Sequence, residues 1–150
     1  MSRLYTLTEL YPLIDRQLKS GGSMSFTVKG TSMKPTLTGG VDTVKIIKPA
    51  HRMQKYDIAF YRRDDCRFVL HRIIKVTRNG YICRGDNQTL KERCVTDDNV
   101  IGLVSEYTHK SRRIKTDSAR HRLYAAICVK TAIPRCFFYS ICQKIRSLYK

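Results

Sequence analysis

This 150-residue chain lacks both the ligand spacing of a zinc site and a long apolar run near its N-terminus, and each absence excludes a class of protein. The six cysteines form no CxxC pair and have no closely spaced histidines, which is the usual ligand pattern of a zinc site. Residues 1–24 contain no long apolar run and are interrupted by Glu9, Asp15 and Lys19. We therefore expect no zinc and no other cofactor. We also expect reduced thiols, no cleavable signal peptide and no N-terminal membrane anchor, with a location in the cytoplasm or on the cytoplasmic face of a membrane.

Acidic residues are also few. The chain has 12 Asp and Glu against 29 Lys and Arg, which gives a net charge of +17. From Tyr107 onward, 11 Lys and Arg face the single acid Asp117, so this last part carries most of the excess. Such a balance favours anionic partners, either acidic lipid headgroups or nucleic acid, and does not choose between them.

The most basic segment, from about residue 118 to 150, also has an apolar surface. Residues 123–142 are long enough to span a bilayer, but Lys130 and Arg135 would each cost about 2.5–3.5 kcal/mol at its centre, and Pro134 lies between them. We expect instead two helices separated at Pro134 that lie on an anionic membrane surface. The alternative, which stays open, is that these helices pack on the rest of the chain or form a dimer contact.

The apolar spacing before Gly21 predicts a single amphipathic helix over residues 7–19, covering an edge of the core. Short β-branched and aromatic runs separated by turn residues then predict strands over residues 43–47, 57–62, 68–76, 80–84 and 99–107. Asn79-Gly80 is typical of a two-residue hairpin turn. The fold class is therefore mainly β and antiparallel. One helix cannot form a helix-turn-helix and no RNA-binding motif is present, so nucleic acid is the less favoured partner.

Ser32 stands at the tip of a predicted bend. It follows an alternating run over residues 26–29, comes two residues after Gly30, and precedes the rigid Pro35. This pattern is typical of a strand that ends in a tight turn with a hydroxyl held at its end. A serine hydroxyl is a weak nucleophile at its own pKa, so a catalytic serine would need a base from elsewhere in the chain.

His71 is the best candidate for that base. Period-two alternation along its strand places it on the same face as Lys75, about 13 Å away at roughly 3.3 Å per residue. An imidazole with a pKa near 6.5 can accept the hydroxyl proton at neutral pH, whereas a lysine must first lose several pKa units. A carboxylate would be needed to orient the imidazole, and both Asp86 and Glu92 are available.

The runs GTSMKPTL, YDIAFYRR, VLHRIIKV and YICRGDNQ occur in this order between about residues 26 and 104. Together they resemble the catalytic domain of type I signal peptidases and the related self-cleaving repressors. The histidine after VL, where bacterial leader peptidases carry lysine, is similar to the endoplasmic-reticulum and archaeal branch. The residue patterns and the resemblance together predict three parts: an N-terminal helix (1–24), a basic amphipathic C-terminal tail (111–150) and, between them, the part that the resemblance implies, a signal-peptidase-like catalytic β-domain (25–110).

The resemblance also implies a serine endopeptidase that cleaves a peptide or precursor after small residues through a Ser32 acyl-enzyme, with His71 as general base. In the histidine branch the pairing acid lies six residues after the GDN aspartate, which implies an orienting role for Glu92 and a supporting one for Asp86. The amide of Ser32 would bind the oxyanion, while Gly30 stands where many bacterial members have a hydroxyl. The alternative is a non-catalytic membrane- or nucleic-acid-binding module on a peptidase-like fold.

Overall fold

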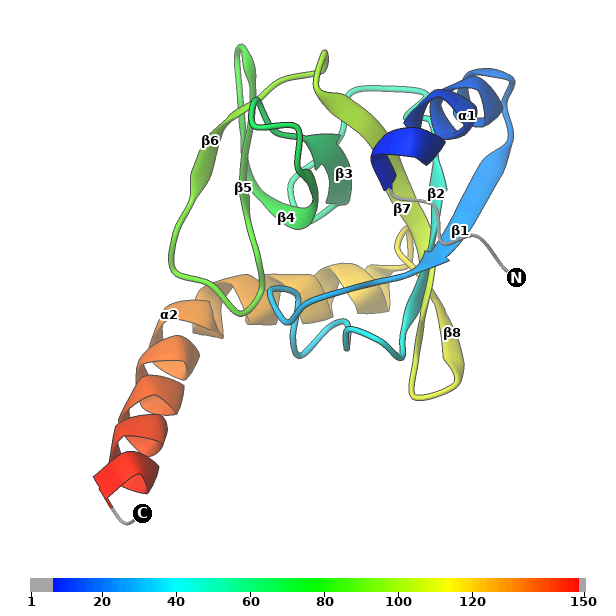
Figure 1. Cartoon of the computed structure of the whole chain (residues 1–150). Helices are drawn as coiled ribbons and strands as arrows, with labels where there is room; N and C mark the ends of the chain where they lie inside the picture. The colour runs from blue at the N-terminus through cyan, green and yellow to red at the C-terminus, as the bar shows by residue number, and fades with distance from the viewer. Residues whose placement is uncertain (1–6, 149–150) are drawn as a thin grey trace.

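The computed structural model describes residues 7–148 and consists mainly of antiparallel β-sheet with one helix at each end (Figure 1). Its elements are α1 (Leu7–Lys19), β1 (Ser23–Thr27), β2 (Thr43–Ile47), β3 (Ile58–Arg62), β4 (Phe68–Thr77), β5 (Gly80–Arg84), β6 (Glu92–Val95), β7 (Val100–His109), β8 (Arg112–Lys115) and α2 (Ala119–Leu148). The strands pair in the order β1-β2-β7-β3-β4-β5-β6, and β8 adds to β7. The mainly β, antiparallel prediction is confirmed.

The helix expected over residues 7–19 is α1, with the predicted bounds. Ile14 and Leu18 are buried in a core cluster that β1, β2, β3 and β7 share. Spacing of three and four residues puts the apolar side chains on one face, and burial of that face holds the helix against the sheet.

Most predicted strands are present within two residues of their expected ends, but β6 and β8 have no counterpart in the prediction. Both are four residues long and rich in charge, and hydrogen bonds to β5 and β7 hold them in the sheet. The hairpin between β4 and β5 is confirmed, but Thr77 pairs with Gly80, so its turn residues are Arg78 and Asn79. Gly80 has φ 149°, and a Cβ there would collide with the carbonyl oxygen of Val95.

A β-bulge corrects one expectation about β4. The register with β5 shifts between Ile73 and Lys75, so the two-residue alternation does not continue through this point. Val76 joins Ile73 in the same apolar cluster, and Lys75 is exposed. Lys75 therefore does not share the face of His71, and the prediction that it does is wrong.

β3 is buried on both faces and separates two core clusters. Ile58 and Phe60 belong to the first cluster, while Ala59 and Tyr61 belong to the second. Ala59 pairs with His71 and Ile58 pairs with Arg72 on β4. Since directly paired residues of neighbouring strands point to the same face, His71 lies on the second side of the sheet and its neighbour on the first. The two sides carry different parts of the candidate site.

α2 is one helix of 30 residues, so the expected separation into two helices at Pro134 is wrong. Figure 1 shows it running beneath the sheet, then bending and projecting from the body. Proline lacks the amide that would bond one turn back, which accounts for a bend rather than an end. Residues of its first part are buried at spacings of three and four: His121, Ala125, Cys128 and Ala132. Within residues 7–148, no helix is both long and apolar enough to cross a membrane.

Candidate active site

His71 and Glu92 meet on the second side of the sheet. The register aligns Ile73 of β4 with Cys83 of β5, and Cys83 with Glu92 of β6, so Glu92 lies on the side of the sheet that Ile73 shares with His71. His71 Nδ1 lies 2.9 Å from Glu92 Oε1. The His71 side chain is 3% exposed, whereas that of Glu92 is 18% exposed. The structure therefore brings together the histidine and the acid that the sequence analysis had paired.

The protonation of this pair follows from its surroundings. Burial lowers the pKa of His71 below its ordinary value, and the charge of Glu92 opposes that shift only in part. At neutral pH the contact is thus a hydrogen bond from a neutral imidazole. Because a carboxylate only accepts, the Nδ1 atom carries the proton and Nε2 keeps its lone pair. This tautomer is the one that a general base requires.

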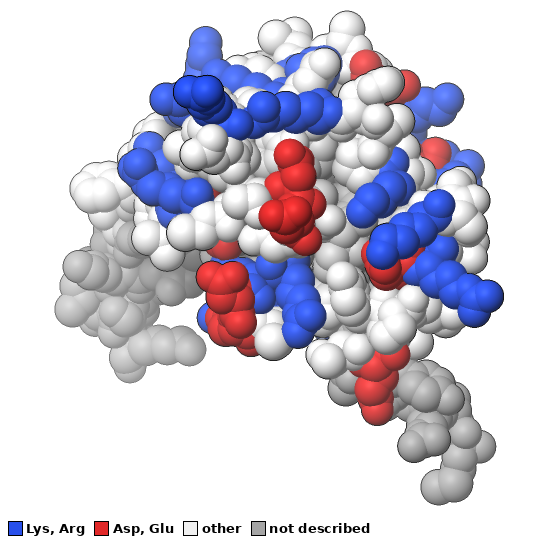
Figure 2. Space-filling model, turned by 90° about the horizontal axis from the view of Figure 1, so that it is seen from above, with Lys and Arg blue, Asp and Glu red and all other residues white. Residues whose placement is uncertain are grey.

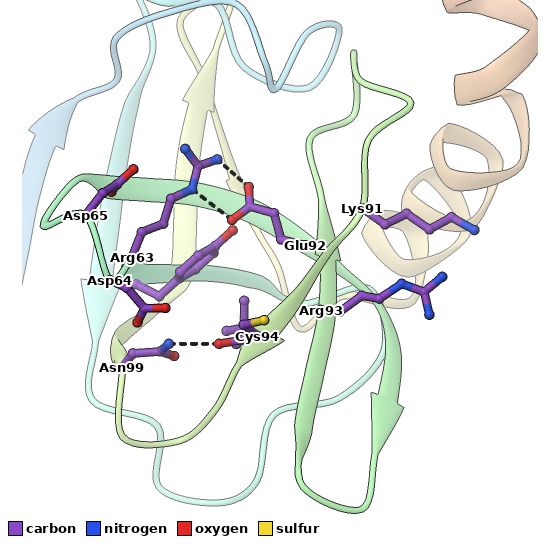
Figure 3. A pocket seen from close by; sticks show the side chains of 10 residues that line it. Arg63, Asp64, Asp65, Lys91, Glu92, Arg93, Cys94 and Asn99 are labelled. Carbon is purple, nitrogen blue, oxygen red and sulfur yellow. Dashed lines mark hydrogen bonds and ion pairs between the residues drawn. The ribbon is translucent and has the colours of Figure 1, made fainter.

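Arg63 and Tyr61 fix the carboxylate of Glu92. Arg63 Nε donates to Oε2 at 2.9 Å and Arg63 Nη2 donates to Oε1, a bidentate pair seen in Figure 3. The Tyr61 hydroxyl lies 3.2 Å from His71 Nδ1 and also bonds Glu92. Burial alone would raise the pKa of Glu92, but the hydrogen bonds from Arg63 and Tyr61 outweigh it and hold that pKa below its ordinary value.

Glu92 forms one wall of an open pocket of about 500 Å³ between the β3–β4 loop and β6. Figure 3 shows Glu92 turned toward Arg63, while Lys91 and Arg93 point to the other side of the strand. The carboxylate that bonds His71 therefore also lines the pocket. The sequence analysis did not predict Arg63 or Tyr61 as site residues, although both lie in the YDIAFYRR run that contributes to the family resemblance.

Ser32 lies in the turn over residues 32–36 and is partly exposed. Its carbonyl oxygen accepts a hydrogen bond of 2.8 Å from the Asn87 amide, and a Cβ on Gly85 would come within 2.6 Å of that oxygen. The bend before it uses Gly30, whose φ is 79°. The Gly85–Asn87 turn therefore fixes the main chain of Ser32. Among the hydrogen bonds of residues 7–148, none joins Ser32 Oγ to His71.

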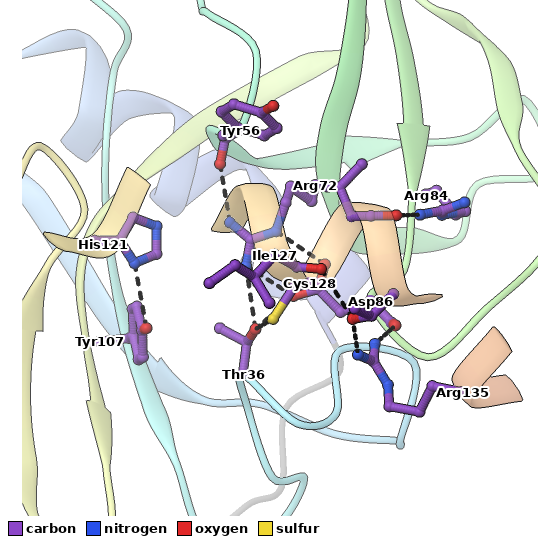
Figure 4. A network of polar contacts seen from close by, with 12 residues as sticks. Thr36, Tyr56, Arg72, Arg84, Asp86, Tyr107, His121, Ile127, Cys128 and Arg135 are labelled. Atoms are coloured by element: carbon purple, nitrogen blue, oxygen red, sulfur yellow. Dashed lines mark hydrogen bonds and ion pairs between the residues drawn. The ribbon is translucent and has the colours of Figure 1, made fainter. Parts of the chain in front are cut away.

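Asp86 pairs with Arg72, not with His71. Arg72 Nε donates to Oδ1 at 2.8 Å and Nη2 donates to Oδ2 at 2.7 Å, and both side chains are almost fully buried. The Thr36 hydroxyl donates to Oδ2, and Arg72 Nη1 donates to the Tyr56 carbonyl at 2.9 Å (Figure 4). Each buried charge therefore has the opposite charge beside it, and further hydrogen bonds satisfy the other polar atoms of the pair. Since Thr36 ends the turn that begins at Ser32, this network connects the two loops of the site.

α2 closes the first side of the sheet over this network. Arg135 donates to the main-chain carbonyl of Asp86, and Arg84 Nη2 donates to the Val129 carbonyl at 2.8 Å (Figure 4). Helix, GDN turn and Ser32 turn are therefore linked by direct hydrogen bonds.

No group of three or more His, Cys, Asp or Glu side chains that could hold a metal ion occurs among the described residues. No protein-family model matches the sequence, and no curated protein matches it significantly.

Proposed function

We propose that this protein is a serine endopeptidase resembling the Ser-His branch of the type I signal peptidases, with a signal-peptidase-like β-domain. The observation that carries the proposal is the 2.9 Å contact between His71 Nδ1 and Glu92 Oε1 in a buried setting that keeps the imidazole neutral. Burial of a histidine and a carboxylate costs desolvation free energy, and titratable groups that are both buried and held by a specific partner cluster at functional sites. The lone pair on Nε2 is then free to act as a base.

In the proposed reaction, Ser32 Oγ attacks the carbonyl carbon of a peptide bond and His71 Nε2 takes the hydroxyl proton. Glu92 stabilises the imidazolium through Nδ1–H, and Arg63 and Tyr61 hold that carboxylate in place. The proton then passes to the leaving amine, and an acyl-enzyme remains on Ser32. A water molecule that gives its proton to His71 Nε2 then attacks the acyl carbon, and the proton returns to Ser32 Oγ as the product acid leaves. Hydrogen bonds between nucleophile and base commonly tighten only when substrate is bound.

Asp86 has a positioning role in this proposal. Its pair with Arg72 shapes the turn whose next residue, Asn87, bonds the Ser32 carbonyl. The amide of Ser32 is the proposed oxyanion donor, and removal of such a donor typically costs about 2.7–4 kcal/mol in the transition state. Following the resemblance, we propose substrates with small residues before the scissile bond.

The test is cleavage of a peptide library with small residues at the first and third positions before the bond, followed by mass spectrometry. We expect cleavage by the wild type, none by Ser32→Ala and His71→Ala, and wild-type cleavage by the matched controls Ser25→Ala and His51→Ala, which change exposed residues outside the site. Since the pKa of His71 is lowered, the acid limb of kcat/KM should fall below about pH 6.5. Cleavage that survives Ser32→Ala would refute the mechanism.

The competing function is a non-catalytic binding module, which the exposed aromatic side chains of α2 favour. A binding module does not need the neutral His71 or its orienting carboxylate. If the wild type cleaves no member of the library while the helix retains a binding activity, the module becomes the better description.

A further inference from the structure

We propose that the outward face of α2 docks on an anionic lipid bilayer and lies along the boundary between headgroups and acyl chains. The proposal goes beyond the peptidase function and does not depend on it. It places the membrane contact on a surface that the candidate active site does not use.

α2 carries a second apolar face, opposite the one that packs on the sheet. Leu123, Ile127, Phe138 and Ile141 recur at spacings that keep them on one side of a helix with 3.6 residues per turn. Leu123 is 67% exposed and Phe138 is 70% exposed, as is its neighbour Phe137. Lys130, Thr131 and Pro134 interrupt this side between Ile127 and Phe138, so the exposed apolar side chains form two groups, one on each half of the helix. Single exposed apolar side chains are ordinary on protein surfaces, but groups of large ones flanked by polar residues mark an interaction site.

The apolar surface continues onto the loop that leads away from the GDN turn. Leu90 is 78% exposed, and its loop forms with Ile133 and Phe137 an open hollow of about 480 Å³. Asn87, at the start of the same loop, bonds the Ser32 carbonyl. A bilayer that received the outward face of α2 would therefore also meet a loop directly connected to the Ser32 turn.

Charge selects an anionic bilayer as the partner. Every charged residue of α2 is cationic: Arg120, Arg122, Lys130, Arg135, Lys144 and Arg146. The face shown in Figure 2, seen from above while α2 lies beneath the sheet in Figure 1, has acidic side chains among its cations, so the chain is not uniformly basic. A second copy that packed through its own α2 would bring the same cations against each other, whereas acidic headgroups compensate them. Lys130 can extend its ammonium group to the headgroups while its stem stays among apolar atoms.

The experiment is co-sedimentation of the full chain with vesicles of phosphatidylcholine alone or mixed with phosphatidylglycerol. We expect binding to the mixed vesicles that weakens at least tenfold on neutral vesicles and falls with added NaCl. The double variant Phe137→Ser/Phe138→Ser should weaken binding at least tenfold, and Arg120→Gln/Lys130→Gln about fivefold for each cation. Val41→Ser, at an exposed apolar residue outside α2, is the matched control and should bind like the wild type.

Equal binding to neutral and anionic vesicles would overturn the proposal, as would binding that the Phe137→Ser/Phe138→Ser variant leaves unchanged. Absence of vesicle binding together with a dimer that this variant dissociates would assign the face to a second copy. Far-ultraviolet circular dichroism and urea denaturation of each variant show that it is folded. Ser32→Ala should bind vesicles like the wild type, so this result and the peptidase result are independent.

Discussion

The most direct test of the site's framework is Asp86→Asn. The substitution keeps the shape of the side chain but removes its charge and replaces one acceptor oxygen by an NH₂ group. Arg72 Nε and Nη2 now donate to the two carboxylate oxygens at 2.8 and 2.7 Å. In the variant one of these donors would face another donor, and the buried guanidinium would lose its counter-charge.

The magnitude follows from burial. Arg72 is 0% exposed and Asp86 is 2% exposed, so water cannot replace the lost partner. Breaking a buried ion pair from one side costs about 3–5 kcal/mol. Domains of this size have a total free energy of unfolding of roughly 5–15 kcal/mol, so the change would be a large fraction of it. With an m-value of about 2 kcal/mol per M, the urea midpoint should fall by roughly 2 M.

The assay is urea denaturation followed by circular dichroism, with the exposed Asp98→Asn as control, which should change the free energy of unfolding by at most about 0.5 kcal/mol. Replacing both partners, as Arg72→Met/Asp86→Leu, should restore much of the stability because no charge is then left buried. A loss below about 1 kcal/mol for Asp86→Asn would refute the reasoning. So would a double variant less stable than Asp86→Asn alone.

Three further predictions concern single features of the fold. Burial lowers the pKa of His121 to about 4, so the unfolded chain binds the extra proton between about pH 6.5 and 4; the free energy of unfolding should decrease over this range as pH falls, and His121→Gln should flatten that dependence. Gly80→Ala should destabilise by roughly 1–3 kcal/mol in urea, because its φ is 149° and its Cβ would collide with Val95; a neutral result would contradict the close approach of β6. In thiol labelling, the exposed Cys94 should react in the native state, whereas Cys83, buried and with its pKa raised to about 12, should react only after denaturation.

Some elements could be predicted from local pattern alone. The bounds of α1 and of β2 and β5 match because apolar periodicity and turn residues act over a few neighbouring positions. The pairing of His71 with Glu92 was expected only from the resemblance, since nothing local connects residues 21 positions apart in the chain. β6 and β8 escaped prediction because their stability comes from hydrogen bonds to a neighbouring strand rather than from an alternating apolar pattern.

Two other errors have the same origin. Alternation assigned Lys75 to the face of His71, and only the pairing with β5 reveals the bulge that changes its side. Pro134 suggested a helix end, but the helix continues through it. The next residue, Arg135, donates a hydrogen bond to the Asp86 carbonyl. The bulge depends on the pairing with β5, and the helix beyond Pro134 is bonded to the GDN turn, so the local pattern by itself shows neither feature.

The sequence by itself determined the mainly antiparallel fold, the helical ends, the basic character of the last segment and the identity of the candidate residues Ser32, His71, Asp86 and Glu92. Tertiary structure alone decided which arginine each carboxylate meets: Glu92 binds Arg63 on one side of the sheet, and Asp86 binds Arg72 on the other. The physical reason is that a strand sends neighbouring residues to opposite faces, so each face finds its partners only when the register is set. The same holds for α2, whose sequence contains two apolar faces and whose packing leaves one of them exposed.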